Sequence, residues 1–282
     1  MKTPRLRHIA ALWSMVHYPS QEKEWNLDKK LAAAKAAGFD GVAGAPSPEM
    51  PKLLKKHGLI MLGYVASGKA KEFGPLLAAN KKAGAHYINV QMADEDTLTP
   101  EATGLAILLM QEAKKLGVEA AIEVHRDTCT ETPEKTYDLA NAYQKITGEL
   151  MPMTWDFSHL SVVKHLWPNN YVEKLIVRPD LIQRAQQFHM RPFNGHHCQI
   201  PVTDGKGNLT TEIKEWFPFA EALLKCWLDG NKNTNREIFV CPEMGPVPGG
   251  YNFSTLPNSW EDAQVLRVEL DKIWKKLTKK RK

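Results

Sequence analysis

Four side chains of the kind that bind divalent metal ions stand where an apolar run of the sequence gives way to a loop. They are Glu123 in Ile-Glu-Val-His, Asp156 in Thr-Trp-Asp-Phe, His189 in Phe-His-Met-Arg and Glu243 in Val-Cys-Pro-Glu. Three carboxylates and one imidazole suit a hard cation, and the imidazole favours manganese, cobalt, zinc or magnesium over calcium. Because the four residues are far apart in sequence, they can form one site only if the fold brings several strand ends together.

The segment 188–197, Phe-His-Met-Arg-Pro-Phe-Asn-Gly-His-His, concentrates further polar side chains and leads into a glycine-rich loop at 203–208. This composition is typical of one wall of an active site. Arg191 follows His189 by two residues and shares its strand face, so it could hold a phosphate or carboxylate with both arms, or form a loop salt bridge. His125 bears the same relation to Glu123 and could contact a substrate or orient the carboxylate.

Each of the candidate ligands has a purely structural alternative. Glu123 could form a strand-end ion pair with Arg126, although a glutamate among apolar neighbours would be costly to bury unpaired. Asp156 could cap the helix that follows it. His189 could be a buried core histidine, in which case His197 would take the ligand role. Glu243 precedes Met-Gly-Pro and has the fewest structural roles to fill.

Eight short apolar runs alternate with longer helical segments along the chain. The expected strands are 9–13, 39–43, 59–65, 86–91, 118–124, 152–157, 188–193 and 238–241. The expected helices are 27–37, 47–57, 69–83, 100–116, 132–147, 159–165 together with 180–187, 211–228 and 260–277. In the first helix Leu27, Leu31 and Ala34 form one apolar stripe, and Gly38 follows as a C-terminal cap.

This alternation predicts an α/β fold, a (β/α)8 TIM barrel formed as a single domain by residues 1–282. The competing architecture, a doubly wound open sheet, needs a glycine-rich phosphate loop after its first strand, and residues 13–17, Trp-Ser-Met-Val-His, are no such loop. In a barrel the loops at the carboxyl ends of the strands build the active site. All four candidate ligands fall there.

The composition is that of a soluble globular protein, with 43% hydrophobic and 24% charged residues and a formal net charge of +5. Part of that charge lies in the lysine-rich segment 275–282, which we interpret as a solvated helix face rather than a surface for nucleic acid or lipid. The four cysteines show no CxxC pairing and indicate reduced thiols. The apolar run 9–16 is too short for a membrane span. We therefore expect a cytoplasmic protein with neither a membrane nor a nucleic acid as partner.

Several of these motifs resemble those of the xylose isomerase-like barrels, the sugar phosphate isomerase/epimerase superfamily, over almost the whole chain. The matching motifs are Asp156-Phe157-Ser158-His159, His189-Met190-Arg191, the later pair His196-His197, and Gly205-Lys206-Gly207. The resemblance implies one divalent metal ion (Mn, Mg, Co or Zn) held by Glu123, Asp156, His189 and Glu243. It also implies a carbohydrate-binding group consisting of His125, His159, Arg191, His196 and His197. Members are often dimers or tetramers, so a homo-oligomer is an alternative to the monomer.

The activity implied by the resemblance is that of an isomerase or epimerase of a sugar, keto-sugar or polyol derivative. The metal would polarise a carbonyl and stabilise an enediolate. Glu123 and Glu243 would act as catalytic base and acid on opposite sides of the metal. Three tryptophans, Trp13, Trp155 and Trp167, could provide an apolar floor for the sugar or belong to the core.

Three other activities are compatible with parts of the pattern. A lyase or dehydratase acting on a keto-sugar, an inosose or a dehydroshikimate-like substrate would start from the same enediolate. An abasic-site endonuclease is less favoured, because such enzymes use further histidines for three zinc ions and the third and fourth strands here end in Tyr64 and Gln91. A catalytically silent sugar-binding barrel is disfavoured by the complete set of four candidate ligands.

Overall fold

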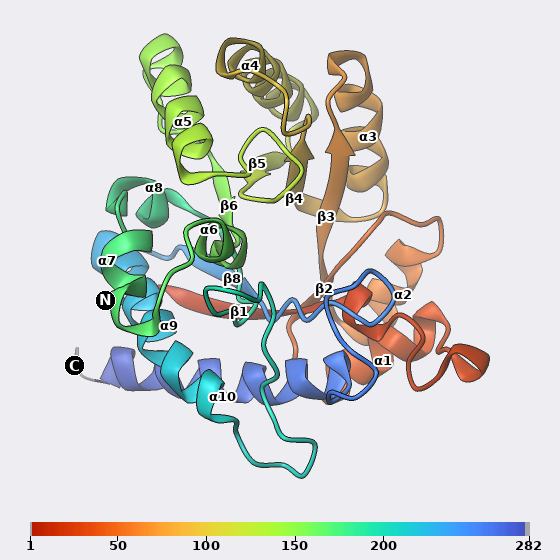
Figure 1. Cartoon of the computed structure of the whole chain (residues 1–282). Helices are drawn as coiled ribbons and strands as arrows, with labels where there is room; N and C mark the ends of the chain where they lie inside the picture. The colour runs from red at the N-terminus through yellow and green to blue at the C-terminus, as the bar shows by residue number, and fades with distance from the viewer. Residues whose placement is uncertain (1, 280–282) are drawn as a thin grey trace.

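Eight parallel strands form a closed barrel in a computed structural model that describes residues 2–279 (Figure 1). Each strand pairs with the next along the chain, and β8 closes the barrel against β1. The strands are β1 (Arg5–Ala11), β2 (Gly41–Ala43), β3 (Ile60–Ser67), β4 (Ala85–Met92), β5 (Glu119–Glu123), β6 (Met153–Trp155), β7 (Gln187–His189) and β8 (Glu237–Cys241). The predicted barrel of eight strands is confirmed.

The helices lie around the outside of the strands (Figure 1). The α-helices are α1 (Leu27–Ala36), α2 (Met50–His57), α3 (Ala70–Lys82), α4 (Thr99–Leu116), α5 (Pro133–Thr147), α6 (Phe157–Val163), α7 (Tyr171–Leu175), α8 (Pro179–Arg184), α9 (Thr211–Gly230) and α10 (Ser259–Lys279). Short 3-10 helices occupy η1 (Leu12–Met15), η2 (Gln21–Lys23) and η3 (Pro168–Asn170). Local signals define many of these ends: Asn26 and Thr132 cap the starts of α1 and α5, and Gly117 ends α4 with φ of 64°.

Several predicted boundaries are wrong, two of them for identifiable reasons. The first strand ends at Ala11, because residues 12–15 form the 3-10 helix η1. The seventh strand ends at His189 rather than at residue 193. Met190 still donates its N–H to Cys241 O at 2.7 Å, but Pro192 has no N–H with which to continue the ladder. The helix expected at 180–187 is shorter in the structure, where α8 ends at Arg184. Helix α7 was not expected.

The interior of the barrel is filled by side chains that alternate along its strands. Ile9, Ala11, Leu62, Phe239 and Cys241 form one buried cluster there, and the rings of Phe239 and Tyr87 are 4.7 Å apart. The filled interior leaves space for ligands only beyond the strand ends, where the loops begin.

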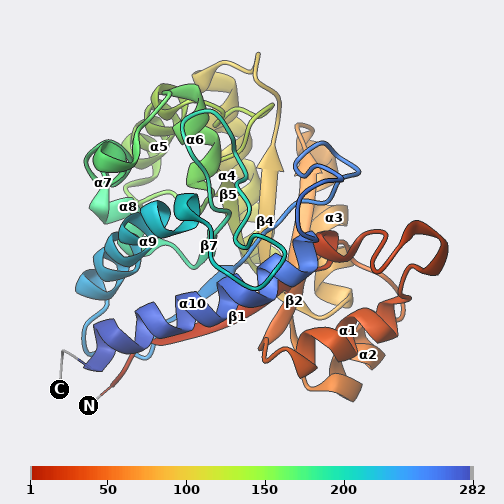
Figure 2. The same ribbon diagram turned by 60° about the horizontal axis from the view of Figure 1, so that its bottom comes forward.

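The last helix and the long connection between β7 and α9 are joined by one buried carboxylate. Asp262 on α10 accepts hydrogen bonds from the N–H groups of Val202 (2.7 Å) and Thr203 (3.1 Å), and Figure 2 shows this connection crossing the start of the helix. This contact holds the second half of the β7–α9 connection against α10. The histidine-rich segment forms the first half of that connection.

The basic C-terminal segment is part of α10 as far as the structure describes it. Lys275 and Lys276 pair with Asp271 and Glu221, as expected of a solvated helix face, and residues 280–282 lie outside the described residues. Within residues 2–279 no helix is both long enough and apolar enough to cross a bilayer.

Candidate functional site

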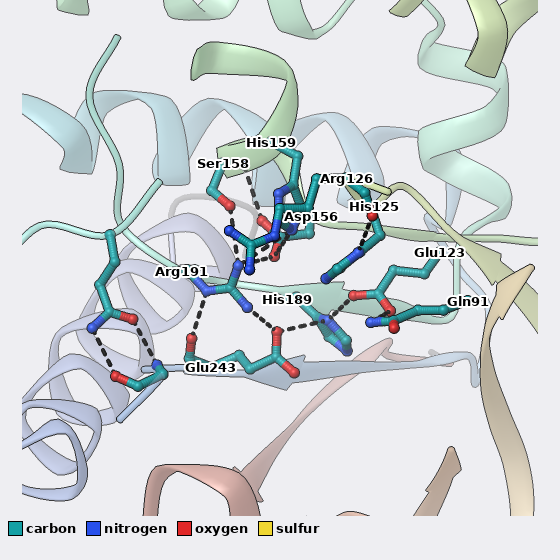
Figure 3. A network of polar contacts seen from close by, with 12 residues as sticks. Gln91, Glu123, His125, Arg126, Asp156, Ser158, His159, His189, Arg191 and Glu243 are labelled. Carbon is teal, nitrogen blue, oxygen red and sulfur yellow. Dashed lines mark hydrogen bonds and ion pairs between the residues drawn. The ribbon is translucent and has the colours of Figure 1, made fainter. Parts of the chain in front are cut away.

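The barrel brings the four candidate metal ligands together at the carboxyl ends of its last four strands. Glu123 ends β5, Asp156 follows β6, His189 ends β7, and Glu243 comes two residues after β8. One donor atom from each lies within 4.8 Å of the donor atoms of the other three. Figure 3 shows His189 between the two glutamates, with Asp156 approaching from the side of Arg191. We call these four residues the ligand cluster.

The imidazole is the centre of this cluster. His189 Nδ1 lies 2.7 Å from Glu123 Oε1 and 3.1 Å from Glu243 Oε2. The imidazole and Glu123 are almost completely buried, and the side chain of Glu243 is 18% exposed. Glu243 is therefore the carboxylate that a ligand can reach most directly.

Three of the four donor atoms lack a hydrogen-bond partner among the described residues. Glu123 Oε1, Asp156 Oδ2 and His189 Nδ1 are buried and make no hydrogen bond of acceptable geometry, although charged neighbours lie within ion-pair distance. Buried polar atoms are nearly always satisfied, so such atoms pointing to one place need an explanation. A single divalent cation would satisfy all three, and carboxylate oxygens with an imidazole nitrogen are suitable ligands for it.

The second oxygen of Glu123 is held by two side-chain amides. Asn89 Nδ2 donates to Glu123 Oε2 at 2.6 Å, and Gln91 Nε2 donates to the same oxygen at 2.9 Å. Tyr64 in turn donates its hydroxyl proton to Gln91 Oε1 at 2.7 Å. Oε1 is thus left to the cluster. The alternative ion pair with Arg126 is not among the contacts of Glu123, because that guanidinium lies over the ring of Tyr251, 4.4 Å from its centroid.

Asp156 both caps a helix and contributes to the ligand cluster, the two roles that its sequence position allows. Its Oδ1 accepts the N–H of Ser158 at 3.0 Å and caps α6. Its Oδ2 points to the cluster and lies 3.0 Å from Arg191 Nη1. The cap therefore fixes the orientation in which the other oxygen reaches the site.

Arg191 is buried beside the ligand cluster and pairs with two of its carboxylates. Its Nη2 lies 2.5 Å from Glu243 Oε2, its Nη1 lies 3.0 Å from Asp156 Oδ2, and its Nε donates to the backbone oxygen of Glu243 at 2.9 Å. The side chain is 1% exposed. Arg191 was predicted to bind substrate. It does line the cavity, but its guanidinium is engaged by the protein's own carboxylates, which leaves little of it for a substrate phosphate.

The two nearer histidines of the predicted substrate-binding group lie on different sides of the cavity wall. His125 lines the cavity, and its ring centroid is 4.3 Å from that of His159. His159 is 3% exposed, and its Nε2 is 3.3 Å from Arg191 Nη1. His159 therefore lies against Arg191, and of these two histidines His125 belongs to the cavity lining.

The two later histidines lie away from the ligand cluster. The ring of His196 contacts those of His165 and Trp167 at centroid distances of 5.9 and 6.3 Å, and His197 Nδ1 is 3.0 Å from Asn194 Oδ1. Both side chains are exposed or partly exposed and neither lines the cavity. The structure thus places neither histidine in the cavity lining, and it groups His189, not His197, with the three carboxylates. The reason is the path of the β7–α9 connection, which runs toward α10.

The electrostatics of the site follow from burial of three acids beside two cations. Burial acts to lower the pKa of His189, but Glu243 and Glu123 outweigh it and raise that pKa well above the ordinary histidine value. Burial acts to raise the pKa of each glutamate, and the charge of His189 outweighs it, so both pKa values are lowered. For Asp156 burial dominates over Arg191 and raises the pKa. The cluster thus attracts positive charge.

A cavity of about 790 Å³ opens onto the ligand cluster and is lined by the loops at the strand ends. His189 and Glu243 form part of its wall, together with the amides of Asn89 and Gln91. Of the three tryptophans proposed for an apolar floor, Trp13 lines this cavity. Trp155 is completely buried in the core, stacked on Phe157, and Trp167 is 66% exposed at the surface.

Three residues at the site had not been assigned from the sequence. Gln187 lies against His189, with 2.6 Å between the two Nε2 atoms; a half-turn of the amide lets it accept the Nε2–H and leave Nδ1 free to coordinate. Asn89 binds Glu123, and Tyr251 lies between the guanidinium groups of Arg126 and Arg191. A polar residue at an inward strand position, two residues from a ligand, is the signal that could have identified Gln187.

Comparison with known proteins yields similar structures but no sequence relatives. No family model and no curated protein matches the chain. An L-ribulose 3-epimerase is similar at a TM-score of 0.64 and 12% identity, over 98% of this chain and 96% of that one. The probable 3-DHS dehydratase AsbF from Bacillus anthracis gives 0.59 and 13%, over 93% and 98%.

A third similar structure carries a bound metal. A xylose isomerase-like TIM barrel protein from Mycobacterium smegmatis, in complex with magnesium, gives a TM-score of 0.58 and 14% identity over 95% of this chain and 97% of that one. At these identities the likeness concerns the fold, and it extends from the first strand to the last helix. The chain has the fold of these structures, a closed (β/α)8 TIM barrel.

Proposed function

We propose that the protein is a divalent-metal-dependent isomerase or epimerase of a sugar, keto-sugar or polyol derivative, acting by proton transfer next to a carbonyl. The observation that carries the proposal is the convergence of three unsatisfied buried donor atoms, from Glu123, Asp156 and His189, beside the carboxylate of Glu243. The epimerase and dehydratase among the similar structures support the same class of chemistry.

In this proposal the four cluster residues hold one divalent ion. When bound, the ion would act as a Lewis acid that polarises a carbonyl and an adjacent hydroxyl of the substrate. Asn89 and Gln91 keep Glu123 oriented through its other oxygen, and the cap on α6 does the same for Asp156. Gln187 sets the ring orientation and tautomer of His189.

Glu243 and Glu123 are the proposed acid–base pair. Their carboxylates lie on either side of His189 (Figure 3), so one can remove a proton from one face of a substrate carbon and the other can return it on the opposite face. Glu243 has the stronger support, because its side chain reaches the cavity. The lowered pKa values keep both groups ionised, which suits the one that acts first as base.

The remaining polar wall of the cavity is suited to substrate hydroxyls. Asn89 Oδ1 is buried and has no hydrogen-bond partner among the described residues, and it belongs to a residue that lines the cavity. His125 offers a ring on the same wall. Such groups orient a polyhydroxylated ligand against the acid–base pair.

A metal-dependent dehydratase is the second candidate, because of the similarity to the probable 3-DHS dehydratase. It would use the same proton removal, followed by loss of a hydroxyl group one carbon further along. A trinuclear nuclease has less support. Tyr64 and Gln91, which occupy the third and fourth strands, hydrogen-bond to each other and supply no histidine for a further metal ion. The guanidinium of Arg191 lies among Asp156, His159 and Glu243, so it occupies the place where these side chains would bind a further cation.

The test is a screen of keto-sugars, both free and as their methyl and aryl glycosides, in deuterated water with Mn²⁺ or Mg²⁺ present. Metal-dependent appearance of deuterium at a carbon next to the carbonyl, with no loss of water, would support the isomerase or epimerase. Deuterium uptake accompanied by an unsaturated product would favour the dehydratase. Absence of exchange in every keto-sugar, from protein shown to contain metal, would refute both.

A further inference from the structure

The active-site cavity is divided into a polar and an apolar half. The polar half, described above, is built from β3 to β8. The other half is built by β1, η1, α1, β2 and the β2–α2 loop, and its lining includes Leu12, Val16, Leu27, Ala43, Pro46 and Met50. We call this half the apolar lobe. It is continuous with the ligand cluster, because one cavity contains both.

The lobe offers apolar surface to a ligand as well as to the protein core, against which Leu12 and Leu27 pack. Leu12, Val16 and Leu27 are only partly buried although they lie within a cavity, and Trp13 stands at the border, edge-on to Tyr251 at 5.0 Å between centroids. The polar side chains of this half do not change its character. Lys30 is paired with Glu24 at 2.5 Å, and Ser47 Oγ is a single hydroxyl without a hydrogen-bond partner among the described residues.

Size and chemistry together favour a ligand larger than a bare monosaccharide. The cavity volume of about 790 Å³ lies within the range of about 300–1,000 Å³ that accommodates drug-sized ligands. A monosaccharide that presents its carbonyl to Glu243 would occupy the polar half and leave the lobe filled with water against apolar walls. An apolar group attached to the sugar would displace that water favourably.

We propose that the substrate is a keto-glycoside, a glycosidically linked sugar whose ring carries the keto group that the proposed reaction needs. Its apolar, preferably aromatic, substituent is held in the apolar lobe while its sugar ring faces the ligand cluster. The inference rests on the proposed function for the identity of the polar half. The Ser47 hydroxyl, which has no hydrogen-bond partner among the described residues, would form a hydrogen bond with one polar group on the substituent, such as a phenol. Trp13 would lie beside the junction of the two parts.

The test compares two unreactive glycosides that differ only in the substituent. The affinities of 4-nitrophenyl β-D-glucopyranoside and methyl β-D-glucopyranoside for the Mn²⁺-loaded full chain would be measured by titration calorimetry. Neither carries the keto group that the proposed reaction needs, so binding is not confounded by turnover. We expect the aryl glycoside to bind roughly 10- to 100-fold more tightly, as burial of an aromatic ring implies.

Substitutions in the apolar lobe test whether the tighter binding of the aryl glycoside arises there. Ala45 is exposed and lines the cavity, so Ala45→Phe should fill the lobe and remove most of the aryl advantage while the methyl glycoside binds as before. Val16→Thr, nearly isosteric, should weaken aryl binding with little effect on folding. Ala78→Phe is the matched control, because Ala78 is exposed on α3 away from the cavity.

Equal affinities for the two glycosides, no binding of either, or an unchanged aryl affinity in Ala45→Phe would overturn the inference. So would a change of oligomeric state in Ala45→Phe in place of a change in affinity, since the lobe would then be covered by a second copy of the chain. Failure of the proposed function looks different: no deuterium exchange in any keto-sugar, with the aryl advantage intact.

Discussion

Arg191 Nη2 lies 2.5 Å from Glu243 Oε2, so a permanent positive charge is bonded to the carboxylate that is most accessible in the site. The same guanidinium reaches Asp156. Without Arg191, the negative charges of the three carboxylates could be neutralised only by one divalent ion and by protonation of His189. With Arg191 and a divalent ion both present and the histidine neutral, the charges of the site sum to zero.

Replacement of Arg191 by Met should destabilise the metal-free protein more than the metal-bound one. Removing one partner of a buried ion pair leaves an uncompensated charge and costs about 3–5 kcal/mol. We expect a loss of this size in chemical unfolding with EDTA present, and a partial recovery on addition of Mn²⁺. The control is Arg7→Met, which breaks a half-exposed pair with Glu237 and should cost about 1 kcal/mol or less. Similar small losses in both variants would contradict the role of Arg191.

Gln187→Leu should weaken metal binding without abolishing it. The amide of Gln187 lies against His189 and fixes which ring nitrogen faces the cluster. Loss of such a partner lowers metal affinity by about 10- to 100-fold. The control is Gln186→Leu at the adjacent position, whose side chain bonds Glu119 on the outside of the barrel. Calorimetric titration with Mn²⁺ would measure both, and equal affinities in the two variants would contradict the assignment.

Glu243→Gln should remove catalysis while the fold is kept. The carboxamide has nearly the same shape but cannot carry a proton between the substrate and solvent. Loss of an acid–base group lowers the rate by roughly 10²- to 10⁴-fold. Glu237→Gln should leave the rate unchanged, because Glu237 is at the start of β8, the end of the strand opposite Glu243, and pairs with Arg5 and Arg7. Full exchange activity in Glu243→Gln would exclude it as acid or base.

His8 should make the protein less stable in mild acid. Its imidazole is 5% exposed, and burial, reinforced by Arg267, lowers its pKa to about 4 from an ordinary value of 6.5. The partly compensating acids are Asp271 and Asp40. Above pH 6.5 the residue is neutral in both folded and unfolded chains. As the pH falls from 6.5 to about 4, only the unfolded chain takes up the proton, so the free energy of unfolding decreases, by at most about 3 kcal/mol from this group.

The measurement for His8 is the difference in unfolding free energy between the wild type and His8→Phe across this pH interval. Other groups contribute equally to both proteins, so the difference isolates the histidine. We expect it to shift in favour of the variant as the pH decreases. A difference that stays constant between pH 7 and pH 4 would show that His8 does not titrate as described.

The barrel and the convergence of the four candidate ligands could be predicted because their signals are local. Apolar runs, helix caps such as Asn26 and terminal glycines such as Gly117 define the alternation of elements. Each candidate ligand lies at the end of a strand or within two residues of it. Parallel strands then bring these ends to one face. The number of strands and their parallel direction are therefore enough to predict that the candidate ligands lie on the same face of the barrel.

The roles of the later histidines could not be predicted, because they depend on a contact between distant parts of the chain. Asp262 binds the N–H groups of Val202 and Thr203, and this directs the segment that contains His196 and His197 away from the cavity. The sequence around the two histidines holds no trace of that contact. The amide support of Glu123 by Asn89 likewise depends on strand register, which apolar patterning alone does not specify.

The central claim is that Glu123, Asp156, His189 and Glu243 hold one divalent ion, and metal content measures it most directly. Protein stripped with chelator, reloaded with Mn²⁺ and freed of excess metal should contain about one ion per chain by elemental analysis. Asp156→Asn and His189→Ala should lose it, whereas His197→Ala should retain it. No bound metal in the wild type, or full content in the Asp156 and His189 variants, would contradict the account.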